Sequence, residues 1–310
     1  MTAPARLLHV TDCHLLPEPG ARLLGVDTAE TLAAVLAQAL DECRPDAILA
    51  TGDLAHEGTP ATYRRFLELV RAGFDGPLLC LPGNHDAGGP FAEVLGREQA
   101  LTLSDWQVLG FDTHEDDRPG ARLGDAARRR LVERLETASG RHVLLACHHP
   151  PLPVGCPWLD KDCIPDGRDL LDSCAAAGRL RALVCGHVHQ VLEAGHGPVE
   201  VLATPSTCFQ FEPGSTRFSI DRSAASGMPG YRWLTLSPDG RVHGEVRRLR
   251  GAPLNIVHER WHRRPLASHL VAQVAARGKG GGIQHVGERG GGAEGVDGHP
   301  IDQCDRCGYG

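Results

Sequence analysis

The sequence predicts a layered α/β sandwich, in which two mixed β-sheets pack together between helices. Two observations favour this fold class. Short, nearly continuous apolar runs recur along the chain, and such runs are typical of strands that are covered on both faces. Helical patterns separate the early runs, whereas the second half is rich in strands. The expected strands span 7–10, 47–50, 78–81, 108–111, 142–147, 182–185, 199–203, 231–236 and 242–249.

Three helices are expected from periodicity and capping residues. An apolar stripe at helical spacing predicts a helix over 27–43, and Asp27 with a glutamate three positions later resembles a capping box. Thr59 followed by Pro60 indicates the start of a second helix. The third helix is expected over 125–137, where many arginines accompany two inward-facing leucines. Helices between strands in this order support a layered α/β domain.

The last part of the chain differs in composition from the rest. Turn residues at 238–240 separate the final two expected strands and predict a hairpin. Residues 1–250 are expected to form one domain, and the glycine-rich residues 251–310 a disordered tail that buries too little apolar surface to order itself. An out-of-frame extension would have the same appearance. In this tail, Cys304 and Cys307 form a lone C-x-x-C, which is weak evidence for structural zinc.

Length, charge and cysteine content restrict the class of protein. The 310 residues carry a net charge of −7, which argues against a nucleic-acid partner because duplex binding usually needs a basic surface. We find no apolar run near the roughly 18 residues that span a bilayer, and the first residues lack the regions of a signal peptide. Eleven cysteines in a chain of this size fit a reduced compartment better than secretion. A cytoplasmic protein without a membrane partner is therefore expected.

Five short blocks of metal-type ligands carry the functional signal, and each follows an apolar run. Their oxygen and nitrogen donors are too numerous for one cation. Two neighbouring metals that share a carboxylate are the economical interpretation, and two-metal sites of this kind hydrolyse phosphate esters. The blocks are Asp12-Cys13-His14, Gly52-Asp53, Gly83-Asn84-His85-Asp86, His148 and Gly186-His187-Val188-His189.

The spacing within the blocks suggests how the donors are shared. Asp12 and His14 are two apart, so on a strand both side chains would point to one side and reach one cation. Asp53 directly follows a glycine that lets the backbone turn sharply, and its carboxylate can bridge two metals. Asn84 offers a neutral carbonyl oxygen, and His148 arrives from another strand end. The sequence therefore predicts ligands from several strands at one sheet edge.

Each of these residues also has an ordinary structural interpretation. A lone histidine after a strand is usually a core or surface residue, and a lone Gly-Asp is usually a turn. With 17 histidines in the chain, one or two suitable placements would mean little. His187 and His189 are two apart, but a loop could aim them at different metals. Five blocks in this order, each at a strand end, favour the metal site over a purely structural origin.

The order D-x-H, G-D, G-N-H-D, H and G-H-x-H resembles the signature of the calcineurin-like metallophosphoesterases. The stretches 24–28, 52–55, 148–160 and 203–208 are similar to the bacterial class III cyclic AMP phosphodiesterases. The resemblance covers about residues 6–250 and implies the family's four-layer sandwich of two mixed sheets flanked by helices. Cys13 departs from the serine or threonine that is more usual there, but it is not a ligand position.

The resemblance also implies a role for each residue of the blocks. It places Asp12, His14 and His189 on the first metal. It places Asn84, His148 and His187 on the second metal, with Asp53 bridging. His85 is implied as the catalytic histidine, and Asp86 as the carboxylate that orients its ring. The implied substrate-binding set is His14, Asp53, Asn84, His85 and His189.

Under this resemblance the expected reaction is hydrolysis of 3′,5′-cyclic AMP to 5′-AMP by in-line attack of a metal-held hydroxide, with His85 protonating the leaving 3′-oxygen. The donor set suits two divalent or mixed-valence transition metals, iron, manganese or zinc, better than magnesium. Two alternatives stay open: a phosphodiesterase or phosphomonoesterase of other nucleotides or lipid-linked phosphates, and an inactive metal-binding scaffold. The acidic charge disfavours an exonuclease.

Several residues near the blocks have two possible roles. His149 is either a hydrogen-bond partner of a ligand or a loop residue. Trp158 and Phe209 could stack on a purine, but a core position is favoured. The segment 204–208 is expected to line the substrate pocket. Three further histidines are expected to be structural or surface residues: His9, His56 and His114.

Overall fold

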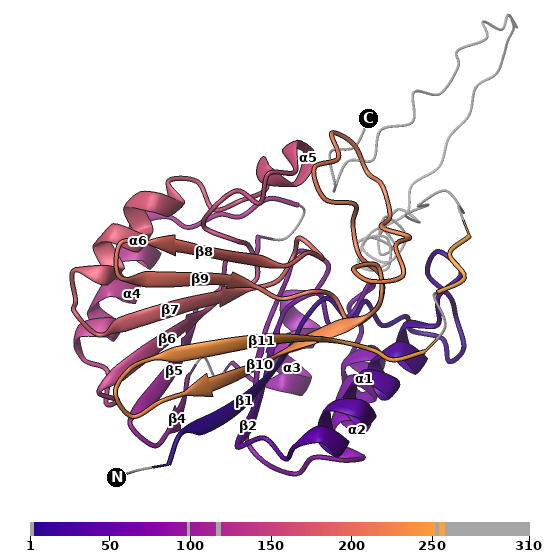
Figure 1. Cartoon of the computed structure of the whole chain (residues 1–310), viewed down its shortest axis with the longest axis horizontal. Helices are drawn as coiled ribbons and strands as arrows, with labels where there is room; N and C mark the ends of the chain where they lie inside the picture. The colour runs from indigo at the N-terminus through magenta and orange to yellow at the C-terminus, as the bar shows by residue number, and fades with distance from the viewer. Residues whose placement is uncertain (1–2, 98–99, 116–118, 252–253, 258–310) are drawn as a thin grey trace, which may run out of the picture.

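Two β-sheets form the centre of the computed structural model, which describes residues 3–97, 100–115, 119–251 and 254–257 (Figure 1). The first sheet contains β1 (Ala5–Val10), β2 (Ala47–Thr51), β3 (Leu78–Leu81), β10 (Gly230–Leu236) and β11 (Val242–Arg248). The second contains β4 (Ala100–Leu103), β5 (Trp106–Gly110), β6 (His142–Ala146), β7 (Leu180–Cys185), β8 (Leu192–His196) and β9 (Val199–Ala203).

Both sheets are mixed, as expected. The first has the order β11-β10-β1-β2-β3, in which β1, β2 and β3 are parallel and the hairpin β10–β11 joins β1 antiparallel. The second has the order β4-β5-β6-β7-β9-β8, with antiparallel strands at its two edges. Parallel neighbours place their carboxyl ends at the same edge of a sheet, which is where loops can bring side chains together.

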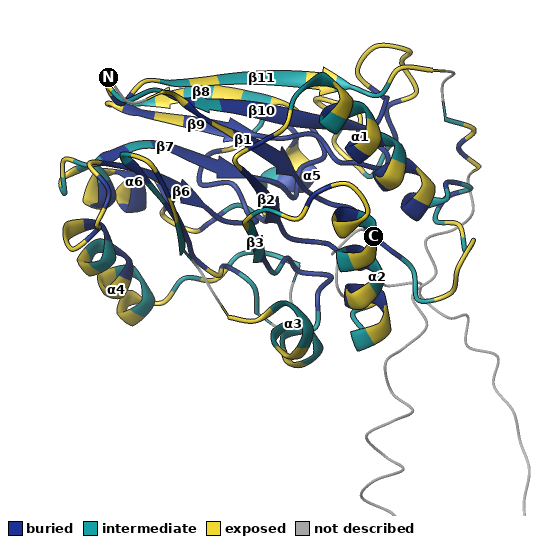
Figure 2. Cartoon of the chain, turned by 90° about the horizontal axis from the view of Figure 1, so that it is seen from below, coloured by how far each residue is buried: buried dark blue, intermediate teal, exposed yellow. Residues whose placement is uncertain are grey.

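Helices cover the outer face of each sheet. They are α1 (Thr28–Glu42), α2 (Pro60–Arg71), α3 (Gly88–Leu95), α4 (Asp125–Glu136), α5 (Pro157–Asp160) and α6 (Gly167–Ala175). Residues of α1 and α2 share a hydrophobic core with the first sheet, and residues of α4 and α6 share one with the second. Figure 2 shows the strands largely buried and the helices with exposed faces outward. The predicted four-layer arrangement is confirmed.

Side-chain alternation along the strands explains the apolar runs. Leu7 of β1 and Leu49 of β2 share the core between the sheets with Leu144 of β6. Their neighbour Leu8 points the other way and packs in the core that contains Leu32 of α1. Because both faces of these strands are buried, the sequence shows continuous rather than alternating hydrophobicity.

The capping residues act as expected at two helices. The Asp27 carboxylate accepts hydrogen bonds from the backbone of Ala29 and Glu30, at 3.2 and 3.1 Å. The Thr59 hydroxyl accepts one from the Thr62 backbone at 3.1 Å, with proline at the first helical position.

Five elements of the structure are not predicted by the sequence patterns: α3, α5, α6, β4 and β8. The glycines and proline that open α3 resemble a turn, and β8 is a partly exposed edge strand with weak apolar character.

Most of the predicted tail lies outside the described residues, including both of its cysteines. Residues 254–257 are described and contact the domain, because Ile256 is buried and the Val257 backbone nitrogen donates to the Leu24 carbonyl at 3.0 Å. The tail and its boundary at 251 stay a prediction. In the described ranges, all nine cysteines are free thiols. No described helix has the length and apolar character needed to cross a bilayer.

Asp162, just after α5, gives a test of stability that does not involve the ligand blocks. Its side chain is buried, and within the described ranges no hydrogen bond reaches Oδ2. Burial raises the pKa of Asp162 from 3.8 to about 6, although Lys161 lowers it. The folded carboxyl therefore keeps its proton when the unfolded one has lost it, so its contribution to stability falls as the pH rises from 3.8 to about 6.

The Asp162→Asn variant should consequently unfold at a higher temperature than the wild type near neutral pH. The difference should shrink as the pH falls below about 4, where the carboxyl is protonated in both states. Thermal unfolding followed by circular dichroism across this range checks the expectation. A difference that did not change with pH would mean that titration of Asp162 does not cause it.

Candidate metal centre

All five ligand blocks lie at the carboxyl ends of their strands, as predicted. The first three follow β1, β2 and β3, and the other two follow β6 and β7 of the second sheet. Backbone hydrogen bonds join neighbouring loops, from Asp12 to the Gly52 carbonyl at 3.0 Å and from Gly186 to the His148 carbonyl at 2.9 Å. The two sheets therefore converge on one buried group of polar side chains.

Left-handed backbone conformations are concentrated at this group. Eight non-glycine residues of the described ranges have positive φ, and five of them are expected ligands: Asp12 (52°), His14 (46°), Asp53 (49°), His187 (69°) and His189 (47°). Such conformations cost energy for residues with a Cβ and gather at functional sites. The expectation that strand pleating aligns the first two ligands is wrong, because β1 ends at Val10. Left-handed turns of the loop aim them instead.

The first three expected ligands form one cluster. His14 Nε2 lies 3.1 Å from His189 Nε2, and His189 Nε2 lies 3.4 Å from Asp12 Oδ1. These ligand atoms of Asp12, His14 and His189 all lie within 4.8 Å of one another. Each side chain is at most 2% exposed, so the cluster is shielded from bulk water.

The second expected set also converges. Asn84 Oδ1 lies 3.1 Å from His148 Nε2 and 3.0 Å from His187 Nδ1, and these two nitrogens are 3.3 Å apart. An amide oxygen and two imidazole nitrogens at such distances form a donor set that suits a transition metal.

Asp53 lies between the two clusters. Its Oδ2 is 3.7 Å from His14 Nε2 and 3.5 Å from His148 Nε2, so one carboxylate reaches a member of each cluster. Burial alone would raise the pKa of Asp53, but the His148 and His85 imidazoles hold it well below its usual range. An ionised carboxylate in this position is suited to bridge two cations.

The pKa values of two expected ligand histidines shift in opposite directions. Burial holds the pKa of His14 well below its usual value despite the nearby Asp53, which leaves the imidazole neutral. Burial would also lower the pKa of His148, yet Asp53 raises it to about 9. A proton and a cation would then compete for His148, and metal binding would release the proton.

Hydrogen bonds behind the clusters test whether the residues fit metal ions. His148 Nδ1 donates to the Thr51 carbonyl at 2.8 Å, and His189 Nδ1 donates to the Phe209 carbonyl at 2.8 Å. Because these bonds place the proton on Nδ1, the lone pair of each Nε2 faces the centre. The arrangement therefore fits two neighbouring cations.

Gly83 permits the close approach of two loops. A Cβ at this position would overlap Asp53 Oδ1 and the Asp53 backbone nitrogen, and would lie 2.8 Å from His148 Cε1. The Gly83→Ala variant should therefore lose about 1–3 kcal/mol of stability, because neither neighbour can move freely. Chemical denaturation measures this loss. Gly88→Ala is the matched control, because no atom lies within 4 Å of its added Cβ; equal stability of the two variants would contradict the expectation.

Asp86 has partners other than the one expected. The family resemblance implies that its carboxylate orients the His85 ring, but His85 Nδ1 lies 3.4 Å from the His56 carbonyl, which accepts its hydrogen bond. The Asp86 carboxylate instead accepts bonds from the backbone of Gly83 at 2.9 Å, from two backbone groups of the β2 loop at 3.2 and 3.1 Å, and from the Tyr63 hydroxyl at 3.1 Å. It therefore holds the two loops together.

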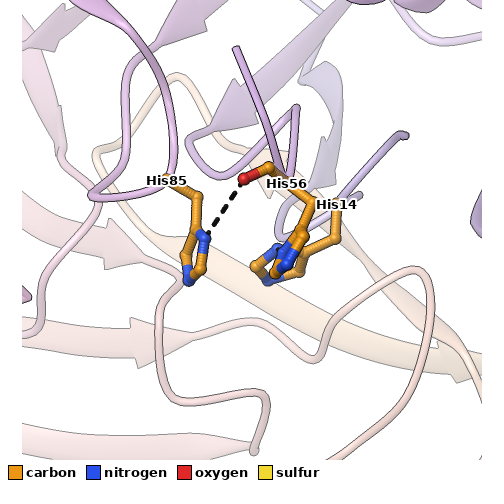
Figure 3. A group of neighbouring side chains, drawn as sticks. All are labelled: His14, His56 and His85. Atoms are coloured by element: carbon orange, nitrogen blue, oxygen red, sulfur yellow. Dashed lines mark hydrogen bonds between the residues drawn. The ribbon is translucent and has the colours of Figure 1, made fainter. Parts of the chain in front are cut away.

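His56 is the residue of this centre that sequence reasoning missed. His9, His56 and His114 were all expected to be structural or surface residues, and His9 is indeed buried in a network of threonine hydroxyls. His56 instead lies beside His14 and His85, and Figure 3 shows the three imidazoles gathered together. Its only sequence signal is its place three residues after the expected bridging aspartate.

The aromatic residues near the blocks belong to the core. Trp158 is 4% exposed, and its ring packs edge-to-face against Phe211 and Phe218 at centroid distances of 4.9 and 5.7 Å. Phe209 is fully buried, with its ring 5.3 Å from that of His189. This agrees with the core position favoured from the sequence over stacking on a purine.

The segment 204–208 supports the loop that carries Asp12, and its expected place beside the substrate stays a prediction. Its residues are buried. The Ser206 hydroxyl donates to the Asp12 carbonyl at 2.8 Å, and the Thr207 backbone donates to the Thr11 carbonyl at 3.2 Å. These bonds fix the backbone that carries Asp12, the first expected ligand.

His149 is buried behind the second cluster. Its Nδ1 lies 2.8 Å from the Thr113 hydroxyl, and its Nε2 donates to the Pro119 carbonyl at 2.9 Å. Its ring centroid lies 4.8 Å from that of His148 and 4.6 Å from that of His187. Its ring therefore forms hydrogen bonds with a neighbouring loop rather than with a proposed ligand, and it packs against two of the proposed ligands.

Comparison with known proteins agrees with this geometry. The family model described as calcineurin-like phosphoesterase matches residues 5–191. The chain is 38% identical over 252 residues to the 3′,5′-cyclic adenosine monophosphate phosphodiesterase CpdA of Pseudomonas aeruginosa. This alignment covers 80% of this chain and 91% of that protein. It is 37% identical over 258 residues to the protein of the same name from Escherichia coli K12, covering 80% and 90%.

A solved structure shares the fold at much lower sequence identity. A dimetal phosphatase from Danio rerio superposes with a TM-score of 0.56 at 13% identity, over 83% of this chain and all of that one. The family model spans more than half of the chain, and the two bacterial relatives align over most of their length. The protein therefore belongs to the calcineurin-like phosphoesterases.

Proposed function

We propose that the protein hydrolyses 3′,5′-cyclic AMP to 5′-AMP at a dinuclear metal centre. The observation that carries the proposal is the position of Asp53, whose Oδ2 lies within 3.7 Å of one imidazole in each ligand cluster. Family membership implies a centre of two divalent metals, and the described clusters fit it. The cyclic AMP phosphodiesterases that are 38% and 37% identical support the choice of substrate.

The proposed ligand assignment follows the clusters. Asp12, His14 and His189 would hold the first metal. Asn84, His148 and His187 would hold the second, and Asp53 would bridge. The nitrogen and oxygen donors suit iron, manganese or zinc. When bound, two such cations supply Lewis-acid stabilisation of phosphate charge and the acidity that ionises water at neutral pH.

His85 is proposed as the general acid. Its Nδ1 proton is directed to the His56 carbonyl, so a second proton on the ring would sit on Nε2 and be available to the departing 3′-oxygen. The His85 backbone nitrogen donates to Asp53 Oδ1 at 2.8 Å, which fixes the loop of the acid to the bridging carboxylate. Asp86 is proposed as a positioning residue that holds this loop through hydrogen bonds to its backbone.

We further propose a substrate partner and a cellular location for the enzyme. The expected partner is a small cyclic nucleotide, held near the metals by His14, Asp53, Asn84, His85 and His189. A net charge of −7 favours this partner over a nucleic acid. We also propose a cytoplasmic location, which the free thiols of the described ranges support.

A comparison of substrates tests the proposed function. The full chain is assayed with cyclic AMP, cyclic GMP, bis(p-nitrophenyl) phosphate and p-nitrophenyl phosphate, while bound metals are counted by mass spectrometry. We expect about two transition metals per chain and production of 5′-AMP that a chelator abolishes. Rapid cleavage of another ester without measurable cyclic AMP hydrolysis would favour the broader phosphoesterase. Bound metal with no hydrolysis of any substrate would favour a scaffold.

A further inference from the structure

The loop after β2 places His56 next to two functional histidines. Its backbone nitrogen donates to the Leu15 carbonyl at 2.8 Å, and the His14 backbone nitrogen donates to the Asp53 carbonyl at 2.8 Å. These bonds run between the β1 and β2 loops and hold them side by side. The half-buried imidazole of His56 is therefore carried on backbone that is tied to the ligand loop.

The first contact of the His56 side chain is with His14. Their Nδ1 atoms lie 3.5 Å apart, while His14 Nε2 faces His189 and Asp53. A neutral imidazole that gives its Nε2 lone pair to a cation carries its proton on Nδ1. His14 Nδ1 then donates and His56 Nδ1 accepts.

The acceptor of the His14 Nδ1 proton differs in kind from the acceptors of His148 and His189, whose Nε2 atoms also face the centre. His148 and His189 direct their Nδ1 protons to backbone carbonyls at 2.8 Å, which no side-chain substitution removes. His14 has an imidazole nitrogen as an acceptor at 3.5 Å. Such partners orient a ligand and raise its basicity, and their loss typically lowers metal affinity or activity about 10–100-fold.

The second contact of His56 is with His85. The two rings stack with centroids 4.8 Å apart and planes 24° apart, and the His56 carbonyl accepts from His85 Nδ1 (Figure 3). The His14 ring meets the His85 ring edge-on, with centroids 4.8 Å apart. One residue therefore touches both a ligand of the first metal and the proposed general acid.

We propose that His56 is a positioning residue that orients His14 through its side chain and His85 through its ring face and carbonyl. The inference rests on the proposed function only for the role of His85, because the effect on His14 concerns metal binding alone. A substitution at His56 should therefore weaken the first metal selectively and leave the second metal in place.

Three variants of the full chain separate the two contacts. His56→Ala removes both the acceptor and the stacked ring, His56→Phe keeps a ring without the acceptor, and His56→Gln keeps an acceptor without the ring. The backbone carbonyl remains in all three. The control is His243→Ala, which removes an exposed histidine from β11. Circular dichroism identifies any variant that fails to fold.

Manganese affinity, measured by competition with a chromogenic chelator, is the main measurement. In His56→Ala and His56→Phe, one of the two manganese ions should bind about 10–100-fold more weakly while the other is unchanged. His56→Gln should recover most of this affinity. His56→Phe should keep a higher kcat than His56→Ala once manganese saturates both sites, because its ring still packs on His85.

Equal manganese affinities for the wild type, His56→Ala and His243→Ala would overturn the proposal. Equal weakening of both ions would also overturn it, because a general disturbance of the loop would not select one site. A third outcome is that the wild type binds two manganese ions, one of them more weakly once His56 is replaced, and still cleaves no cyclic AMP. In that case the proposed function fails, and the effect of His56 on His14 stands.

Discussion

Replacing His85 with alanine should lower kcat for cyclic AMP by about 10²–10⁴-fold, the usual contribution of a positioned general acid. The metal content should not change, because the backbone hydrogen bond from His85 to the bridging carboxylate survives the substitution. Steady-state kinetics with metals counted on the same sample measure both quantities.

A substrate with a better leaving group sharpens this test. Bis(p-nitrophenyl) phosphate releases a phenolate that needs little protonation, so His85→Ala should slow its cleavage much less than that of cyclic AMP. The exposed His243→Ala variant serves as the control for loss of a histidine. Loss of a metal ion from His85→Ala would show that its ring is a ligand, and equal kcat values would remove it from the chemistry.

Asp53→Asn should have the second large effect. The amide keeps an oxygen that can accept from the His85 backbone, but it removes the negative charge between the two clusters. Metal content should fall below two ions per chain. Activity should fall by about 10³-fold or more, since metal ions supply several kcal/mol of transition-state stabilisation and each 1.36 kcal/mol is tenfold in rate.

The matched control for this variant is Asp75→Asn, an exposed aspartate that pairs with Arg44 at the surface. It carries the same chemical change without contact with the ligand clusters. Full metal content in Asp53→Asn would contradict a bridging role. Recovery of activity at high metal concentration would show that the charge of Asp53 sets affinity more than the rate of the chemical step.

The sequence predicted the layers and the meeting point of the blocks for a physical reason. Strands buried on both faces leave a continuous apolar signal, and parallel strands bring their carboxyl ends to one edge. Asp53 and His148 could therefore be placed together although they are far apart along the chain. The metal-binding roles proposed for them remain predictions for experiment.

Features set by loop geometry could not be predicted in the same way. Asp86 bonds to backbone groups of two loops, and no spacing rule reveals which amide groups a folded loop presents. His56 follows Asp53 without any motif, and its neighbour His14 is distant in sequence. The edge strand β8 is partly exposed, so it lacks the apolar run that marks central strands.

The left-handed backbone at five of the proposed ligands has a consequence for mutagenesis. Alanine has a Cβ, so alanine at Asp12 or His187 would remove the donor and keep the unfavourable torsion angles, which cost roughly 1–2 kcal/mol per residue. Glycine adopts such angles readily. At these positions, the difference in unfolding free energy between paired alanine and glycine variants, corrected for the greater entropy of glycine in the unfolded chain, therefore reports the conformational energy that the fold stores to aim each side chain.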